Sequence, residues 1–276
     1  MKRKALITST ALLLVALMCL ATASYAWFTA TGATEITGLQ VEVKGADAAI
    51  QLSENKENWR ASLTKQQLID DGQKVPNILT AVSTVDGKNF FATTYTAAGE
   101  WDANVTSDGY ILIDFYAKAP SAGTASFNLD FVANTKQDGT SDMKDGQLDL
   151  FKSAVKVAFA EGDNALTTYD LAVDSTDGYK PMKSDAAVAQ KVFDEDKNNY
   201  YFEPTTGTDT AANYGDARTQ SAWAATRTVS FAKNEVKHFT VAIWLEGMDK
   251  DCVGSFDMKY IDVVMDFTGW QAQTAA

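Results

Sequence analysis

The stretch "HFTVAIWLEG" (residues 238–247) indicates the class of fold. Apolar side chains occupy every second position in it, at Phe239, Val241, Ile243 and Leu245. Successive side chains of a β-strand point to opposite faces, so this spacing predicts a strand with one face in a core and one face in solvent.

Five further runs repeat this alternation. They are GLQVEVKG (38–45), YILIDFYAKA (110–119), ASFNLDFVAN (125–134), AVKVAF (154–159) and YIDVVMDF (260–267). Turn-forming Gly and Asp cluster between the runs, as in SDGY and STDGY. Strands with one polar face are typical of antiparallel sheets stacked over a shared core. The sequence therefore predicts a mainly β protein, a jelly-roll-like antiparallel β-sandwich with short helices inserted in its connections.

Two segments predict the inserted helices. In LTKQQLIDDG (63–72), Thr64 and Gln67 have the spacing of a capping box, and Gly72 is a helix stop. KSDAAVAQKVFDED (183–196) is rich in helix formers and predicts a second helix from Ser184.

The N-terminus predicts export. Lys2, Arg3 and Lys4 precede an apolar run that ends in small residues, which is the pattern of a signal peptide. Cleavage is predicted between Ala26 and Trp27. It would remove a signal peptide of residues 1–26 and leave a mature chain of residues 27–276, which is predicted to form a single β-sandwich domain. The alternative is an uncleaved membrane anchor, because residues 5–28 carry no charge and are long enough to cross a bilayer.

Composition limits the classes of partner. The chain has a formal net charge of −12, and removal of the three basic residues of the leader makes it −15. Such a chain repels nucleic acid and anionic lipid, so neither is expected as a partner of the mature protein. The mature chain keeps one cysteine, Cys252, which cannot form an internal disulfide. Scarce cysteine in an exported protein favours a Gram-positive bacterial source.

Catalytic motifs are absent from the sequence. There is no G-x-S-x-G elbow, and His238 is the only histidine. By alternation His238 lies on the polar face of its strand, so it is predicted to be a solvated strand residue. H-E-x-x-H is also absent, and one histidine with one mature cysteine cannot complete a zinc tetrad. We predict no enzyme activity, no catalytic residues and no cofactor.

Calcium is the best of the metal hypotheses. Asp194, Asp196 and Asn198 have alternating oxygen-ligand spacing, but Asn199 and Thr205 replace the loop glycine and the closing glutamate of an EF-hand. A second acidic group, Glu246, Asp249 and Asp251, lies in a tight turn. At the first group the prediction is an acidic helix end, with calcium binding as the alternative, and no metal site is assigned.

Aromatic residues suggest an alternative function. Six lie in predicted connections, where they could stack on sugar rings or close the ends of the core: Trp59, Trp101, Trp223, Tyr200, Tyr201 and Tyr214. Glycan binding is therefore the alternative to a structural role.

The ends of the chain resemble the TasA/camelysin group of exported Gram-positive surface and biofilm-matrix proteins. The resemblance rests on the junction SYAWFT (24–29), the first strand ITGLQVEVKG (36–45), and the closing strands FTVAIWLEGMDKDC (239–252) and YIDVVMDFTG (260–269). It implies a jelly roll, export and, in some members, polymerisation into matrix fibres through donated N-terminal strands. Other members were described as surface metalloproteases, but no metal motif here matches that activity.

These observations predict a secreted structural protein of the cell surface or biofilm matrix. Its expected partners are copies of itself, forming a homopolymer, or other matrix proteins. Membrane contact is expected only before signal cleavage. A secreted adhesin is the alternative, and a secreted metallohydrolase ranks below both.

Overall fold

The structure is a computed structural model that describes residues 33–44, 50–95, 101–133, 147–171, 178–179, 187–188, 190–194, 199–203, 218–219, 227–249, 252 and 261–273. The helices are α2 (Lys65–Asp70) and α3 (Gln147–Ala154). The strands are β1 (Ala33–Val43), β2 (Gln51–Ser53), β3 (Ser62–Thr64), β4 (Ile78–Ser83), β5 (Phe90–Tyr95), β6 (Trp101–Thr106), β7 (Ile111–Lys118), β8 (Gly123–Ala133), β9 (Val155–Glu161), β10 (Thr167–Asp170), β11 (Gly178–Tyr179), β12 (Ala187–Val188), β13 (Gln190–Asp194), β14 (Asn199–Glu203), β15 (Arg218–Thr219), β16 (Arg227–Phe231), β17 (Val236–Glu246) and β18 (Ile261–Ala272).

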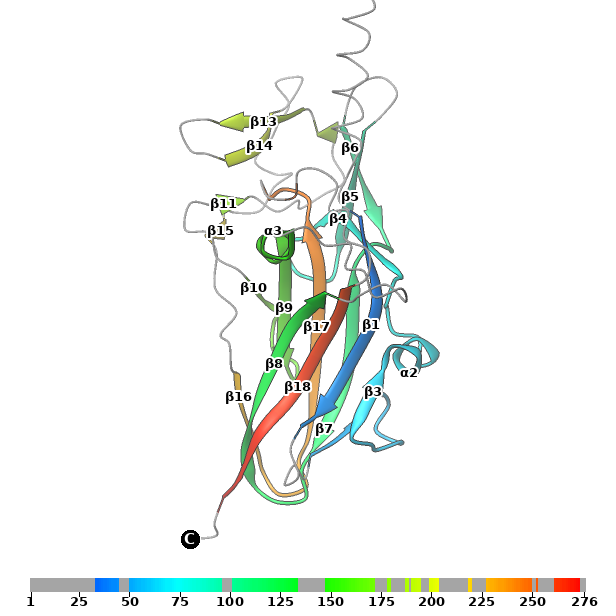
Figure 1. The fold of residues 1–276 in the computed structure, drawn as a ribbon, viewed down its shortest axis with the longest axis vertical. Coiled ribbons are helices and arrows are strands. Elements are labelled where there is room, and N and C mark those ends of the chain that lie inside the picture. The colour runs from blue at the N-terminus through cyan, green and yellow to red at the C-terminus, as the bar shows by residue number, and fades with distance from the viewer. Residues whose placement is uncertain are drawn as a thin grey trace, which may run out of the picture.

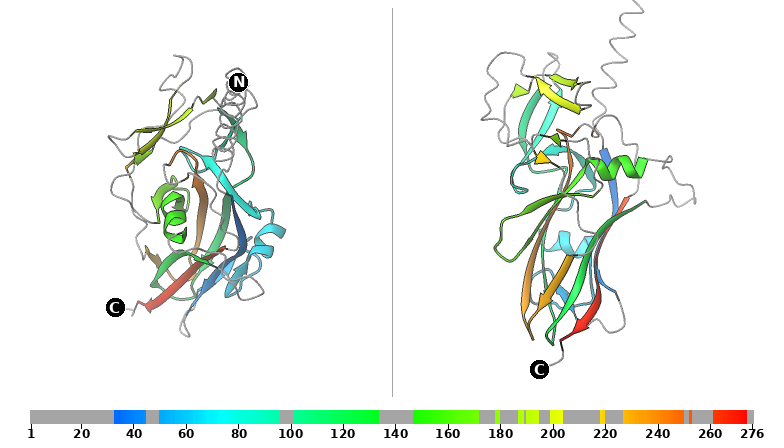
Figure 2. Two further views of the ribbon diagram at one scale, coloured as in Figure 1. Left: turned by 45° about the horizontal axis from the view of Figure 1, so that its top comes forward. Right: turned by 90° about the vertical axis from the view of Figure 1, so that its left-hand side faces the viewer.

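The long strands form a two-layered sandwich (Figures 1 and 2). One layer has the order β3-β1-β18-β8-β16, and the other has the order β10-β9-β17-β7-β2. β4 pairs with the end of β17 and with the start of β1, and so connects the two layers. β5, β6 and β12 extend from β4 towards the upper end of Figure 1. The predicted mainly β sandwich is confirmed.

The core lies between the two layers and is rich in phenylalanine. Phe127 of β8 lies 5.3 Å from Phe159 of β9, and Phe267 of β18 lies 5.6 Å from Phe239 of β17, measured between ring centroids. Such aromatic pairs add to the stabilisation that burial of apolar area already gives. The inward faces of the six predicted strands supply most of this core, as alternation predicted.

Most neighbouring strands are antiparallel, as predicted, but two pairs are parallel. β1 runs parallel to β18, and the end of β17 runs parallel to β4. Both pairs join strands that are distant in the chain, so no tight hairpin turn imposes the antiparallel direction.

The helix at residues 65–70 is confirmed in detail. The Thr64 side chain accepts from the backbone N–H of Gln67, and the Gln67 side chain accepts from the N–H of Thr64. This reciprocal capping box satisfies two backbone donors that a helix start leaves unpaired. Gly72 follows the helix with φ of +81°, a left-handed conformation that favours glycine.

The helix predicted from Ser184 is wrong. The described residues of that segment form β12 and β13, and β13 pairs in antiparallel register with β14. Helix propensity is a weak preference, and pairing with an aromatic-rich strand overrides it here. The helix that the sequence reading missed is α3, directly before β9. No helix among the described residues is long and apolar enough to cross a membrane.

Candidate functional site

A second, smaller apolar core covers part of the outer face of β9 and β17. The Phe90 ring stacks on Tyr110 with centroids 3.7 Å apart and meets Trp244 edge-on at 5.6 Å. The loop before β5 lies directly on β9, since a Cβ added to Gly87 would come within 3.0 Å of the Ala158 Cβ. The buried members of this core are Val82, Phe90, Tyr110, Ala158, Ala242 and Trp244.

Lys156 lies on this covered face, in β9, and its side chain is fully buried. Strand register places it opposite Asp170 of β10 on one side and opposite Trp244 of β17 on the other. The Lys156 Nζ lies 2.6 Å from Asp170 Oδ1 and 2.7 Å from Asp249 Oδ2. It also donates to the backbone oxygen of Ser153, in the last turn of α3, at 2.6 Å. We call Lys156, Asp170, Asp249 and Glu246 the lysine network.

The two aspartates keep Lys156 protonated. Burial alone would lower the pKa of Lys156, because it disfavours the charged amine, but Asp249 and Asp170 outweigh burial and raise the pKa. The negative end of the α3 dipole, at Ser153, adds in the same direction. One cation therefore faces two carboxylates, neither of which has more than 3% of its side chain exposed.

Glu246 is the last residue of β17 and is also fully buried. Its Oε2 accepts from Trp244 Nε1 at 2.9 Å, and its Oε1 accepts from the backbone N–H of Met248 at 3.1 Å. Burial raises the pKa of Glu246 to about 7, although hydrogen bonds from Ser83, Trp244 and Met248 and the charge of Lys156 oppose the shift. Glu246 is therefore a buried acid that titrates near neutral pH.

The turn after β17 brings Glu246 and Asp249 together in the chain. The backbone N–H of Asp249 donates to the backbone carbonyl of Glu246 at 3.0 Å, and that of Cys252 donates to the backbone carbonyl of Asp249 at 3.1 Å. Gly247 in turn donates to Val82 of β4 at 2.9 Å. The network thus gathers an amine, two carboxylates and a titratable acid where β4, β9, β10 and β17 meet, which are groups able to exchange protons and acyl bonds.

His238 forms a different polar group, further along the same face of β17. Its Nε2 lies 2.9 Å from Asp114 Oδ1, and its ring stacks on Tyr116 with centroids 4.9 Å apart. Thr240 Oγ1 donates to the same Asp114 oxygen at 2.5 Å. In a nucleophilic triad the hydroxyl would donate to the histidine, whereas here it donates to the carboxylate. The His238 side chain is 31% exposed, and its position fits a partly solvated strand residue.

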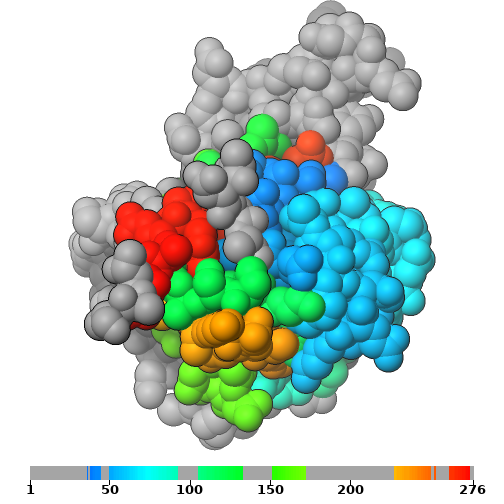
Figure 3. Space-filling view, turned by 90° about the horizontal axis from the view of Figure 1, so that it is seen from below, coloured from blue at the N-terminus to red at the C-terminus, as the bar shows by residue number. Residues whose placement is uncertain are grey.

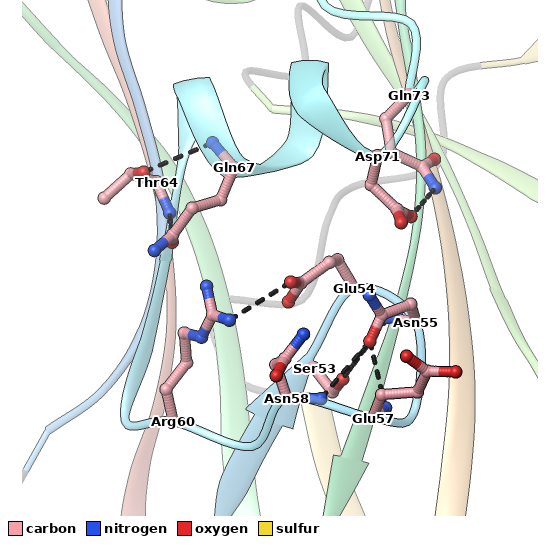
Figure 4. A network of polar contacts seen from close by, with 10 residues as sticks. All are labelled: Ser53, Glu54, Asn55, Glu57, Asn58, Arg60, Thr64, Gln67, Asp71 and Gln73. Carbon is pink, nitrogen blue, oxygen red and sulfur yellow. Dashed lines mark hydrogen bonds and ion pairs between the residues drawn. The ribbon is translucent and has the colours of Figure 1, made fainter.

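The loop after β2 returns to β2, where Arg60 pairs with Leu52, and is held by its own polar contacts (Figure 4). Asn55 Oδ1 accepts from the backbone N–H of Glu57 at 2.9 Å, and Arg60 lies 3.2 Å from the carboxylate of Glu54. Lys56, at φ of +68°, places its amine 4.4 Å above the Tyr116 ring. Figure 3 shows the blue-to-cyan surface of this part of the chain beside the green surface of residues 105–133 and the orange surface of residues 227–249.

Trp59 is the one predicted sugar-stacking residue whose side chain the structure describes. It is half-buried, and the Lys118 amine lies 4.0 Å above its ring. One face of this ring is therefore already in a cation–π contact. Trp101 lies in β6, and Tyr200 and Tyr201 lie in β14, but their side chains are outside the described part, as are Trp223 and Tyr214. Glycan binding stays a prediction.

The acidic groups considered for calcium have different outcomes. Asp194 ends β13 opposite Asn199, while its side chain and all of Asp196 and Asn198 lie outside the described residues. Glu246 and Asp249 are described, and their carboxylates face Trp244 and Lys156. In the part of the chain that the structure covers, no group of His, Cys, Asp and Glu is arranged to hold a metal. Asp251, and the predicted cleavage residues Ala26 and Trp27, lie outside that part.

Sequence reasoning missed the lysine network. Alternation places Lys156 and Glu246 on the faces opposite the main core, as the structure does, but it predicts that those faces are solvated, and both side chains are buried. A usable signal was present: Lys156 is flanked in AVKVAF by apolar residues on both sides, and Glu246 ends a run with Trp244 on its own face. A charge within a run that is apolar on both faces indicates a buried and therefore paired group.

Comparison with known proteins gives no relative for this chain: no family model and no curated protein matches it. The resemblance of the chain ends to the TasA/camelysin group stays a prediction.

Proposed function

We propose that the chain is an exported structural protein of the bacterial cell surface or extracellular matrix, which assembles with copies of itself by exchanging its N-terminal strand. The signal-like leader, the strongly acidic composition and the β-sandwich support this proposal. The main observation in its favour is the position of β1 in the sheet.

β1 lies between strands that are remote from it in the chain. It pairs in parallel with β18 from Ile36 to Val43, and in antiparallel register with β3 and, at its start, with β4. Ile36, Leu39 and Val41 are buried in the main core. No hairpin turn links β1 to β18. The β1 strand of another copy could therefore occupy the same position in the sheet and make the same contacts.

Exchange therefore replaces the donation to an open sheet edge that the resemblance implies. Residues 33–43 are already paired within their own chain. To assemble, they must leave their own sheet and pair with the same strands in the sheet of another copy. The contacts of the closed chain form again in the assembly. The free-energy cost of exchange is therefore small once the connection after β1 opens.

A disulfide that fixes β1 in its own sheet tests the proposal. Gln40 and Val264 are register partners in the β1–β18 pair, so Gln40→Cys combined with Val264→Cys places two thiols side by side. Oxidation of the monomer should abolish self-association in light scattering and electron microscopy, and reduction should restore it.

The two single cysteine variants, treated in the same way, are matched controls, and native Cys252 is only 7% exposed. Oxidation after assembly should instead yield covalent chains between copies. If the oxidised double variant assembled as readily as the reduced one, or if the wild type stayed monomeric at all concentrations, exchange of β1 would be refuted.

A further inference from the structure

The lysine network holds an amine and a carboxyl group in contact where water is excluded. The Lys156 Nζ and Asp249 Oδ2 are 2.7 Å apart, and the two side chains are 0% and 1% exposed. Fixing two reactants in one geometry removes the entropic cost of bringing them together. Exclusion of water also favours condensation over the reverse hydrolysis.

We propose that Lys156 and Asp249 condense to form an intramolecular isopeptide bond, which covalently joins β9 to the turn after β17. The new bond links Lys156 Nζ to Asp249 Cγ. The bond that breaks joins Asp249 Cγ to one of its oxygens, which leaves as water. No oxidant, nucleotide or other co-reactant is needed.

The protons of the reaction balance within the network. Asp170, 2.6 Å from the amine, accepts one proton from the Lys156 ammonium and frees its lone pair for attack on Asp249 Cγ. Glu246, in its protonated form, supplies the proton that makes Asp249 a neutral acyl acceptor. One hydrogen stays on the amide nitrogen, and the water takes one hydrogen from that nitrogen and the proton that Asp249 received from Glu246. The proton held by Asp170 then passes to Glu246, so both groups end as they began.

Asp249, rather than Asp170, is assigned as the acyl partner because of its place in the chain. It shares a hydrogen-bonded turn with Glu246, the acid whose pKa burial raises to about 7. Asp170 lies in β10, across β9 from β17, and keeps the role of proton acceptor. Condensation also replaces a buried ammonium and carboxylate by a neutral amide, which relieves the desolvation that a buried ion pair carries.

Mass spectrometry of the secreted chain under denaturing conditions tests this inference. The wild type should be lighter than its sequence by one water molecule, and a protease digest should contain the Lys156 peptide joined to the Asp249 peptide. Because the digest identifies the joined peptides directly, its result does not depend on where the leader is cleaved. A full mass with no joined peptide, or a Lys156 peptide joined to Asp170, would overturn the assignment.

Variants separate the bond from the ion pair. Lys156→Arg keeps the cation but forms no amide, so it should have its full mass. Lys237→Arg is the matched control, because Lys237 pairs with Glu161, whose side chain is 37% exposed, and the variant should retain the loss of water. Glu246→Gln should fold but lose water many times more slowly.

The pH dependence reports the role of Glu246. In wild-type chain synthesised in unfolded form, before any bond has formed, and then folded by dilution of denaturant, the rate of water loss should fall as pH rises through about 7. A rate that is independent of pH in this range, or equal in Glu246→Gln, would remove Glu246 from the reaction. None of these measurements depends on self-association, so the bond and the proposed assembly can fail separately.

Discussion

The outer face of β17 differs between its two halves. At His238 and Thr240 it is partly exposed, and the polar groups there share the accessible carboxylate of Asp114. At Trp244 and Glu246 the same face is fully buried under Phe90 and its neighbours. The strand and its alternation are continuous, so the difference comes from the cover that Val82, Phe90 and Tyr110 supply.

This contrast indicates how much a charge contributes in each setting. An ion pair in solvent is screened and adds little to stability, whereas a buried charge that loses its partner is strongly destabilising. Polar substitutions at the two ends of β17 should therefore differ several-fold in their effect on the free energy of unfolding.

The largest effect is expected from Lys156→Met. Relative to Lys156→Arg, which keeps the cation and forms no amide, it leaves Asp170 and Asp249 buried without a cation, which should lower the free energy of unfolding by about 3–5 kcal/mol. Urea unfolding followed by circular dichroism measures this. Lys237→Met is the matched control: Lys237 lies at the start of β17, on the opposite face from Lys156, and its partner Glu161 is 37% exposed, so the change should cost about 1 kcal/mol or less. Equal losses in the two variants would contradict the contrast.

A smaller effect, dependent on pH, is expected from Glu246. Its pKa rises from 4.5 to about 7 on folding, so between these values the folded chain binds the proton more tightly than the unfolded chain. The stabilisation is complete below pH 4.5 and is lost as pH rises to about 7, by about 3 kcal/mol in total for this shift.

Glu246→Gln should remove this dependence. Urea unfolding at pH 5 and pH 8, which together span most of the change, compares the two chains. The wild type should lose stability relative to the variant between the two values. A constant difference between wild type and variant would show that Glu246 has the same pKa in both states.

The sequence predicted the main core and not the second one, for a physical reason. Residues such as Val241 and Ile243 have a local period of two, which sets their face whatever covers it. The cover over Trp244 comes from Phe90 and Tyr110, which are distant in the chain, and periodicity within β17 carries no information on them. The capping box at Thr64 was predictable because all its partners lie within one helical turn.

The same argument explains the segment from Ser184. Its residues favour a helix locally, but β13 forms by pairing with β14. Because β14 follows the segment in the chain, the composition of the segment alone does not reveal this pairing. Lys156 was read as solvated for the same reason, since its partners Asp170 and Asp249 are brought to it by β10 and by the turn after β17. Properties set by neighbours along the chain were predictable, and those set by tertiary cover were not.

The smallest effect is expected from Asp114→Ala, at the open half of the β17 face. The variant removes the acceptor of both His238 and Thr240, but these groups are partly exposed and can bond to water instead. The free energy of unfolding should fall by about 1 kcal/mol or less at low ionic strength. The loss should be smaller at high ionic strength, because salt screens interactions between exposed charges. Urea unfolding at low and high ionic strength measures both quantities, with Asp114→Asn as the variant that keeps an acceptor. A loss as large as that of Lys156→Met would mean that this half of the face is covered as well, and the difference between the two halves of β17 would then not arise from burial.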